Sequence, residues 1–233
     1  MAICVWETRV SRLFPYLALA SFPVASLLAL NPVRFSWGLH HGFEPMPVAV
    51  RDKAESVDRY FDFVTDALTA GFVVILMLWS GVGPAAVGLR TEHWGSNVAI
   101  GVTAGALLIL IQILLVRRYP NMEPLPTTDR YQRRSVGLWV VVFLVGSSVE
   151  EFWIAFCLVS MAATGHSAFI AITATAAVFG VQHLEYRLPA ALAVALKGAV
   201  SALLFLWQGS LIPMILYHFI GNLGTLYWLR RTA

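Results

Sequence analysis

The stretch SVGLWVVVFLVGSSVEEFWIAFCLVSM, residues 135–161, predicts the fold and contains the most unusual feature of the chain. Its only charged residues are Glu150 and Glu151. About 20 mostly apolar residues suffice for a helix to cross a bilayer. An acidic residue at the centre of such a helix costs about 2.5 to 3.5 kcal/mol on insertion scales. The stretch therefore predicts a membrane helix whose two glutamates have partners, protons or a function.

The composition of the whole chain supports a membrane protein. Of its 233 residues, 58% are hydrophobic and 12% are charged, and the mean hydropathy is +0.72, outside the usual range of soluble domains. Gly, Pro and polar clusters divide the apolar runs. These features predict an all-α, polytopic membrane helix bundle with about seven transmembrane helices. The helices are expected at residues 13–30, 64–86, 96–116, 136–159, 168–184, 189–207 and 211–229.

The basic residues predict how the helices are oriented. Lys and Arg favour the cytoplasmic side, and most of them follow the first, third, fifth and seventh predicted helices. The amino terminus is therefore expected outside and the carboxyl terminus inside, although Arg9 and Arg12 oppose this orientation. The first segment could instead be a signal peptide, but its small-residue pattern at Ala18 to Ala20 comes early for one. Residues 48–63 are expected to form a helix at the membrane surface.

The net charge of +3 comes from the basic residues of the cytoplasmic connections, which are expected to face anionic lipid headgroups. No nucleic-acid partner is therefore expected. The chain is expected in the lipid bilayer as a multi-pass protein of the cell (inner) membrane of a prokaryote. The sequence does not indicate its oligomeric state.

Other polar residues at membrane depth narrow the possible functions. His183 ends the fifth predicted helix, while His218 and Asn222 share one face of the seventh at i, i+4 spacing. A lone intramembrane histidine is usually an interhelical hydrogen-bonding group, and the glutamate pair alone could be a buried polar clamp. Together, carboxylate and imidazole can deprotonate a water, and imidazole and amide N–H groups can stabilise an oxyanion. The set indicates a hydrolytic site.

Three short motifs resemble those of a known family. EEFWIA at 150–155, FGVQH at 179–183 and HFIGN at 218–222 are similar, in order, to the Glu-Glu-x-x-x-Arg, Phe-x-x-x-His and His-x-x-x-Asn motifs of the CPBP family. That family contains CAAX prenyl endopeptidases and bacteriocin-processing and abortive-infection-like membrane proteins. The resemblance covers residues 136–229. It implies a glutamate-dependent intramembrane endopeptidase that uses an activated water on a membrane-associated protein or peptide, without a metal or other cofactor.

The resemblance also implies roles for individual residues. Glu150 resembles the general base that activates water with His183, and Glu151 resembles its supporting residue. His218 and Asn222 resemble the pair that holds the oxyanion. Residues 135–233 would then be the catalytic helical core, made of the last four helices, and residues 1–134 would be N-terminal transmembrane helices and the surface segment.

The chain departs from the family motif at Ala155, where the family has Arg. This absence leaves the substrate subclass open. Lys197 lies near the middle of the sixth predicted helix, where a cation is costly. It is expected either to pair with Glu151 or Glu185 or to lie at the membrane interface.

Three other functions stay open from the sequence. Carboxylate and imidazole groups also suit Zn²⁺ in a metal-dependent protease, although no His-Glu-x-x-His motif is present. Glu150 or Glu151 could be the proton relay of a proton-coupled transporter, although inverted repeats are not evident. A non-catalytic membrane scaffold is the third alternative, and the missing Arg favours it. The sequence names neither the substrate nor a need for prenylation.

Overall fold

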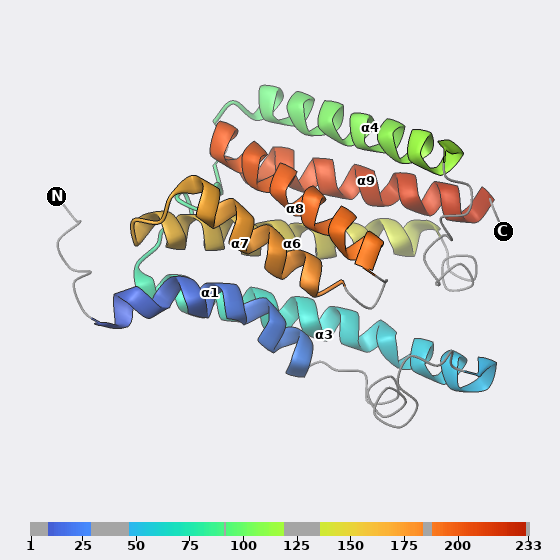
Figure 1. Cartoon of the computed structure of the whole chain (residues 1–233), viewed down its shortest axis with the longest axis horizontal. Helices are drawn as coiled ribbons and strands as arrows, with labels where there is room; N and C mark the ends of the chain where they lie inside the picture. Colours follow the sequence, from blue (N-terminus) through green and yellow to red (C-terminus); the bar gives the residue numbers. More distant parts are fainter. Residues whose placement is uncertain (1–8, 29–46, 91, 119–135, 184–187, 232–233) are drawn as a thin grey trace.

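The computed structural model describes residues 9–28, 47–90, 92–118, 136–183 and 188–231 (Figure 1). Over these residues the chain forms helices and no strand, which confirms the all-α bundle. Successive helices run in opposite directions (Figure 1). They are α1 (Arg9–Leu28), α3 (Val48–Ser80), α4 (Trp94–Arg118), α6 (Val136–Ala163), α7 (Ala168–Val181), α8 (Leu188–Gln208) and α9 (Leu211–Arg231).

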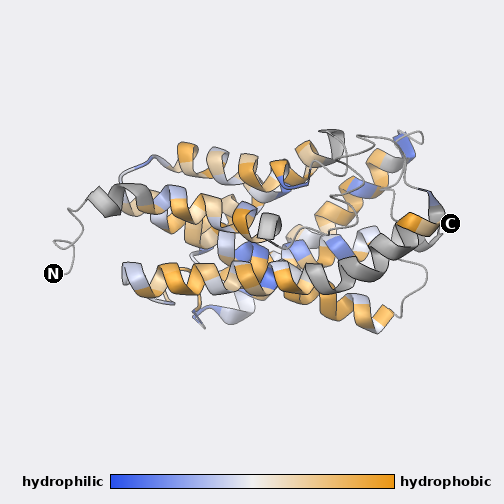
Figure 2. Cartoon of the chain, turned by 90° about the horizontal axis from the view of Figure 1, so that it is seen from below, coloured by the Kyte–Doolittle hydropathy of each residue, from blue (hydrophilic) through white to orange (hydrophobic). Residues whose placement is uncertain are grey.

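Four of these helices are long and apolar enough to cross a membrane, through residues 63–80, 94–115, 136–163 and 191–208. Three others contain shorter apolar stretches, at 14–25, 168–181 and 211–226. Figure 2 shows hydrophilic segments near the middle of the bundle, among helices that are hydrophobic over most of their length. The prediction of an integral membrane protein is thus confirmed. Residues 29–46, 119–135 and 184–187, which include parts of the predicted cytoplasmic connections, lie outside the described residues, so the orientation stays a prediction, as does the division at residue 134.

The second predicted helix differs most from the structure. The surface segment and the membrane helix, expected to be separate, form one helix of 33 residues, α3. Residues 48–70 contain no Gly or Pro that would interrupt it. The helix ends at Ser80, earlier than expected, because Gly81 adopts a left-handed conformation with a φ of 70°.

The centre of the bundle is α6. Its residues from Trp153 to Leu158 are almost completely buried, and it packs against α1, α3, α7, α8 and α9. The indole Nε1 of Trp153 donates a hydrogen bond of 3.0 Å to the carbonyl of Ala18 in α1. Phe14, Ala18 and Phe22 are buried as well, so α1 is an integral part of the bundle. A helical segment buried on all sides needs no polar face, which explains why the residues from Trp153 to Leu158 are all apolar.

The helix α4 packs chiefly along α9, through a seam of glycines. Gly101 and Gly105 of α4 face Pro213 and Ile220 of α9. A Cβ atom at Gly101 would lie 2.8 Å from the Cα of Pro213, which is too close for a side chain. Small residues allow membrane helices to approach in this way. The seam therefore fixes the position of α9 relative to α4.

Candidate active site

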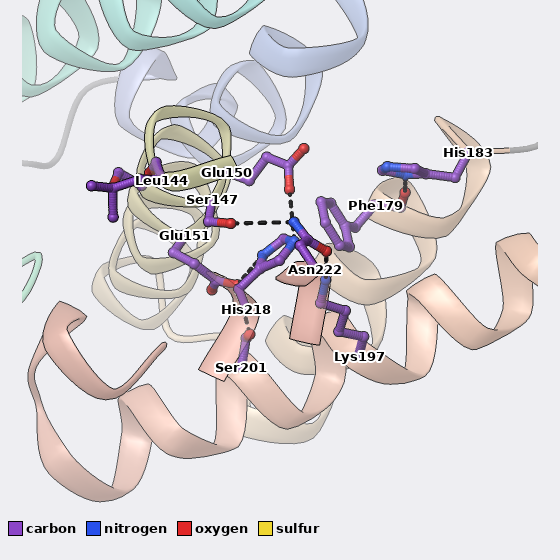
Figure 3. Close-up of polar contacts among 11 residues, drawn as sticks. Leu144, Ser147, Glu150, Glu151, Phe179, His183, Lys197, Ser201, His218 and Asn222 are labelled. Atoms are coloured by element: carbon purple, nitrogen blue, oxygen red, sulfur yellow. Dashed lines mark hydrogen bonds and ion pairs between the residues drawn. The ribbon is translucent and has the colours of Figure 1, made fainter. Parts of the chain in front are cut away.

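The candidate site lies inside the bundle, between α6, α8 and α9 (Figure 3). Each of these helices contributes two polar residues at i, i+4 spacing, which places both on one helix face. The three faces are turned toward one another. The pairs are Ser147 and Glu151 in α6, Lys197 and Ser201 in α8, and His218 and Asn222 in α9, and Glu150 in α6 completes the set.

The imidazole of His218 connects the two glutamates. Its Nε2 lies 3.2 Å from Oε2 of Glu150, and its Nδ1 lies 2.7 Å from Oε1 of Glu151. A carboxylate can only accept hydrogen bonds, and a neutral imidazole has one N–H. Both bonds therefore form only when the three groups hold at least two protons between them. His218, Glu150 and Glu151 consequently form one proton-sharing unit.

The two glutamates have different surroundings. The side chain of Glu150 is 19% exposed, whereas Glu151 is fully buried. Ser201 Oγ donates a 2.7 Å hydrogen bond to Oε1 of Glu151, the same oxygen that contacts His218. The second carboxyl oxygen of Glu151 has no hydrogen-bond partner among the described residues. Glu151 is thus held from two helices, and Glu150 is the more accessible carboxyl group.

The side chain of Asn222 is held between α6 and α8. Its Oδ1 accepts a hydrogen bond of 2.8 Å from Lys197 Nζ, and its Nδ2 donates one of 3.3 Å to Ser147 Oγ. Lys197 therefore faces the site, nine residues after the start of α8 at Leu188, which favours the expectation of a partner inside the bundle. Its hydrogen-bond partner is Asn222 rather than the expected Glu151. The other expected partner, Glu185, lies outside the described residues.

His183 lies just after α7 and contacts Phe179. Its Nδ1 donates to the backbone carbonyl of Phe179 at 2.8 Å. Figure 3 shows the ring of Phe179 between His183 and His218, and the Phe179 ring centroid is 5.0 Å from that of His183 and 6.1 Å from that of His218. With the proton on Nδ1, a neutral His183 has an acceptor at Nε2. Its expected cooperation with Glu150 stays a prediction.

Three polar residues near the site were not singled out from the sequence. Ser147 and Ser201 lie one turn from Glu151 and Lys197, so helical spacing could have identified both. The third is Asp66 of α3. Its Oδ2 would lie 3.7 Å from a Cβ atom at Gly146, one turn before Glu150. No local pattern relates Asp66 to a residue so far along the chain.

The position at which the family motif has Arg is apolar here. Ala155 is completely buried and belongs to the hydrophobic core. The cation of the site comes instead from Lys197 on another helix. Over the described residues, no group of three or more His, Cys, Asp or Glu side chains is arranged to hold a metal ion.

Comparison with known proteins identifies a related family. Residues 132–224 match the model of the family described as Type II CAAX prenyl endopeptidase Rce1-like. The match confirms the resemblance drawn from the three motifs. It begins just before α6 and ends within α9, so it includes all five residues proposed from the sequence. No curated protein and no solved structure matches the chain.

Proposed function

We propose that this chain, a protease-type hydrolase by its match to the CAAX prenyl endopeptidases, cleaves a peptide bond with a water activated by Glu150. The match supports an intramembrane protease of the CAAX type. The observation that carries the proposed role of Glu150 is the contact of His218 with both Glu150 and Glu151. His218 lies one helical turn from Asn222. The substrate would be a membrane-associated protein or peptide, in the cell membrane of a prokaryote.

Glu150 is proposed as the general base because it is the more exposed of the two carboxyl groups. It would take a proton from a water, whose oxygen then bonds to the carbonyl carbon of the peptide bond. The carbonyl oxygen becomes an oxyanion in the tetrahedral intermediate. When the C–N bond breaks, the proton held by Glu150 passes to the leaving amine, which restores the carboxylate.

The proton count of the site links this base to an oxyanion donor. An ionised Glu150 can only accept from Nε2 of His218, so Nε2 must then carry a hydrogen. The state in which Glu150 can act as a base is thus also the state in which His218 can donate an N–H. A developing oxyanion would compete with Glu150 for this hydrogen and would take a second from Asn222 Nδ2.

Glu151 is proposed to position His218. The 2.7 Å contact with Nδ1 fixes the ring, and Ser201 fixes the carboxyl group. Negative charge on Glu151 would also stabilise positive charge on the imidazole. His183, near the end of α7, would accept a hydrogen bond from the attacking water through Nε2.

The proposal is tested by comparing the protein termini in membranes of cells that express the wild type or Glu150→Gln. New termini are expected with the wild type only, since Gln has nearly the shape of Glu but cannot take the proton. The exposed Glu92 provides a matched control, Glu92→Gln, which should keep wild-type cleavage. Undiminished cleavage by Glu150→Gln would defeat the mechanism. Proton-coupled solute flux in liposomes without any cleavage would favour a transporter instead.

A further inference from the structure

Lys197 is a cation in the middle of a membrane-spanning helix, and its hydrogen-bond partner is an uncharged amide. Its ammonium lies 2.8 Å from Oδ1 of Asn222. A Lys at membrane depth is costly and usually has a function. The proposed mechanism assigns none to it.

The chemistry of the ammonium group determines how the Asn222 amide is oriented. An ammonium has three donors and no acceptor, so only the oxygen of the amide can face it. Rotation of the amide by 180° would turn its NH₂ group toward Lys197 and place donors against donors. The contact therefore holds the NH₂ group on the opposite side, toward Ser147 of α6.

This orientation directs the N–H groups of Asn222 toward the helix that carries the proposed base. Ser147 is buried and lies one turn before Glu151 on the same face of α6. A cation on the oxygen side of an amide also polarises it, which makes its N–H groups stronger donors. One contact thus gives Asn222 both its direction and its donor strength.

We propose that Lys197 is a positioning residue that holds and polarises Asn222 as an oxyanion donor. This inference rests on the proposed function, because it requires Asn222 to act on the oxyanion. Lys197 of α8 provides a cation at the site, whereas α6, which carries both glutamates, has an alanine at position 155, where the family motif has Arg. Lys197 acts through Asn222 and does not itself contact the substrate.

The test measures cleavage of a quenched-fluorescent, farnesylated peptide ending in a CAAX sequence, with the enzyme in proteoliposomes. Lys197→Met removes the donor and keeps an unbranched side chain suited to a membrane helix. Loss of one oxyanion donor costs about 10²- to 10³-fold in kcat. Lys197→Met should cost less than Asn222→Ala, with KM nearly unchanged, since the interaction strengthens only in the transition state. Lys197→Arg retains donors and charge and should recover most of the activity.

A double variant separates positioning from general damage. If Lys197 acts through Asn222, adding Lys197→Met to Asn222→Ala should cause no further loss of kcat. Losses that multiply in the double variant, or an unchanged kcat in Lys197→Met, would overturn the inference. Thermal unfolding in detergent shows whether each variant is folded.

A measurement without substrate tests the contact itself. The side-chain amide NMR signal of Asn222, identified by its loss in Asn222→Ala, should shift in Lys197→Met, and an unchanged signal would contradict the inference. The cleavage assay distinguishes the two proposals. If Glu150→Gln is inactive while Lys197→Met is fully active, the role of Lys197 fails alone, whereas an active Glu150→Gln defeats the proposed function.

Discussion

Replacing each glutamate of the pair by glutamine should separate the base from its support. In Glu151→Gln, the amide oxygen can still accept from Ser201 Oγ, and the amide can still bond Nδ1 of His218, as acceptor when Nδ1 carries a hydrogen and as donor when it does not. The new NH₂ group takes the place of Oε2, which has no hydrogen-bond partner among the described residues. Two hydrogen bonds are therefore kept, and we expect the variant to fold and to insert into membranes.

The size of the effect follows from the change of acceptor. A hydrogen bond to a charged group contributes about 1.5 to 3 kcal/mol, against about 0.5 to 1.5 kcal/mol for a neutral pair. The difference, about 1 to 1.5 kcal/mol, corresponds to a loss of about 10-fold in rate. Glu150→Gln should lose about 10²- to 10⁴-fold, because it removes the general base.

The assay is the cleavage rate of the same farnesylated peptide in proteoliposomes, with thermal unfolding of each variant as the control for folding. Glu151→Gln should unfold near the wild-type temperature and retain measurable turnover. If Glu151→Gln is as inactive as Glu150→Gln, or if the order of the two is reversed, the assignment of the base to Glu150 is wrong.

Three further variants or treatments test other contacts. Ser201→Ala should lower the free energy of unfolding by about 1 to 3 kcal/mol, because it removes the hydroxyl that donates to the buried Glu151. Ser148→Ala is the control: the hydroxyl of Ser148 donates to the backbone carbonyl of Leu144 at an exposed position, so this variant should unfold like the wild type. Gly101→Ala should lower both the unfolding temperature and kcat, because its Cβ meets the backbone of α9; Gly95→Ala, with open space around it, is the control and should change neither. Cleavage should survive dialysis against a strong chelator, and a loss that Zn²⁺ restores would favour the metal-dependent alternative.

The sequence was sufficient for features that depend on local pattern. Apolar runs located the seven helices of the described residues, and the i, i+4 spacing of His218 and Asn222 placed both on one face of α9, which meets α6 in the structure. The predicted end of the second helix is wrong because the apolar run continues past Gly81, where the chain makes a tight turn. Hydropathy alone does not distinguish a helix end from an apolar turn.

The features that sequence reasoning missed depend on which helix faces meet. Lys197 was expected to pair with a carboxyl group, since charge complementarity is the simplest guide to the partner of a buried cation. Its actual partner lies on α9, and Ser201 reaches Glu151 from α8. Helical periodicity shows that Lys197 and Ser201 share a face but not which helix that face meets.

The glycine seam between α4 and α9 makes catalytic geometry dependent on a helix outside the matched segment. A slide of α9 by one residue would move His218 by about 1.5 Å along the helix axis, enough to stretch its hydrogen bonds beyond their usual range. The close contact of Gly101 with Pro213 opposes this slide, because a residue with a larger side chain cannot take the place of the glycine. Grafting residues 132–224 into another membrane scaffold should therefore require α4 to be transferred with them.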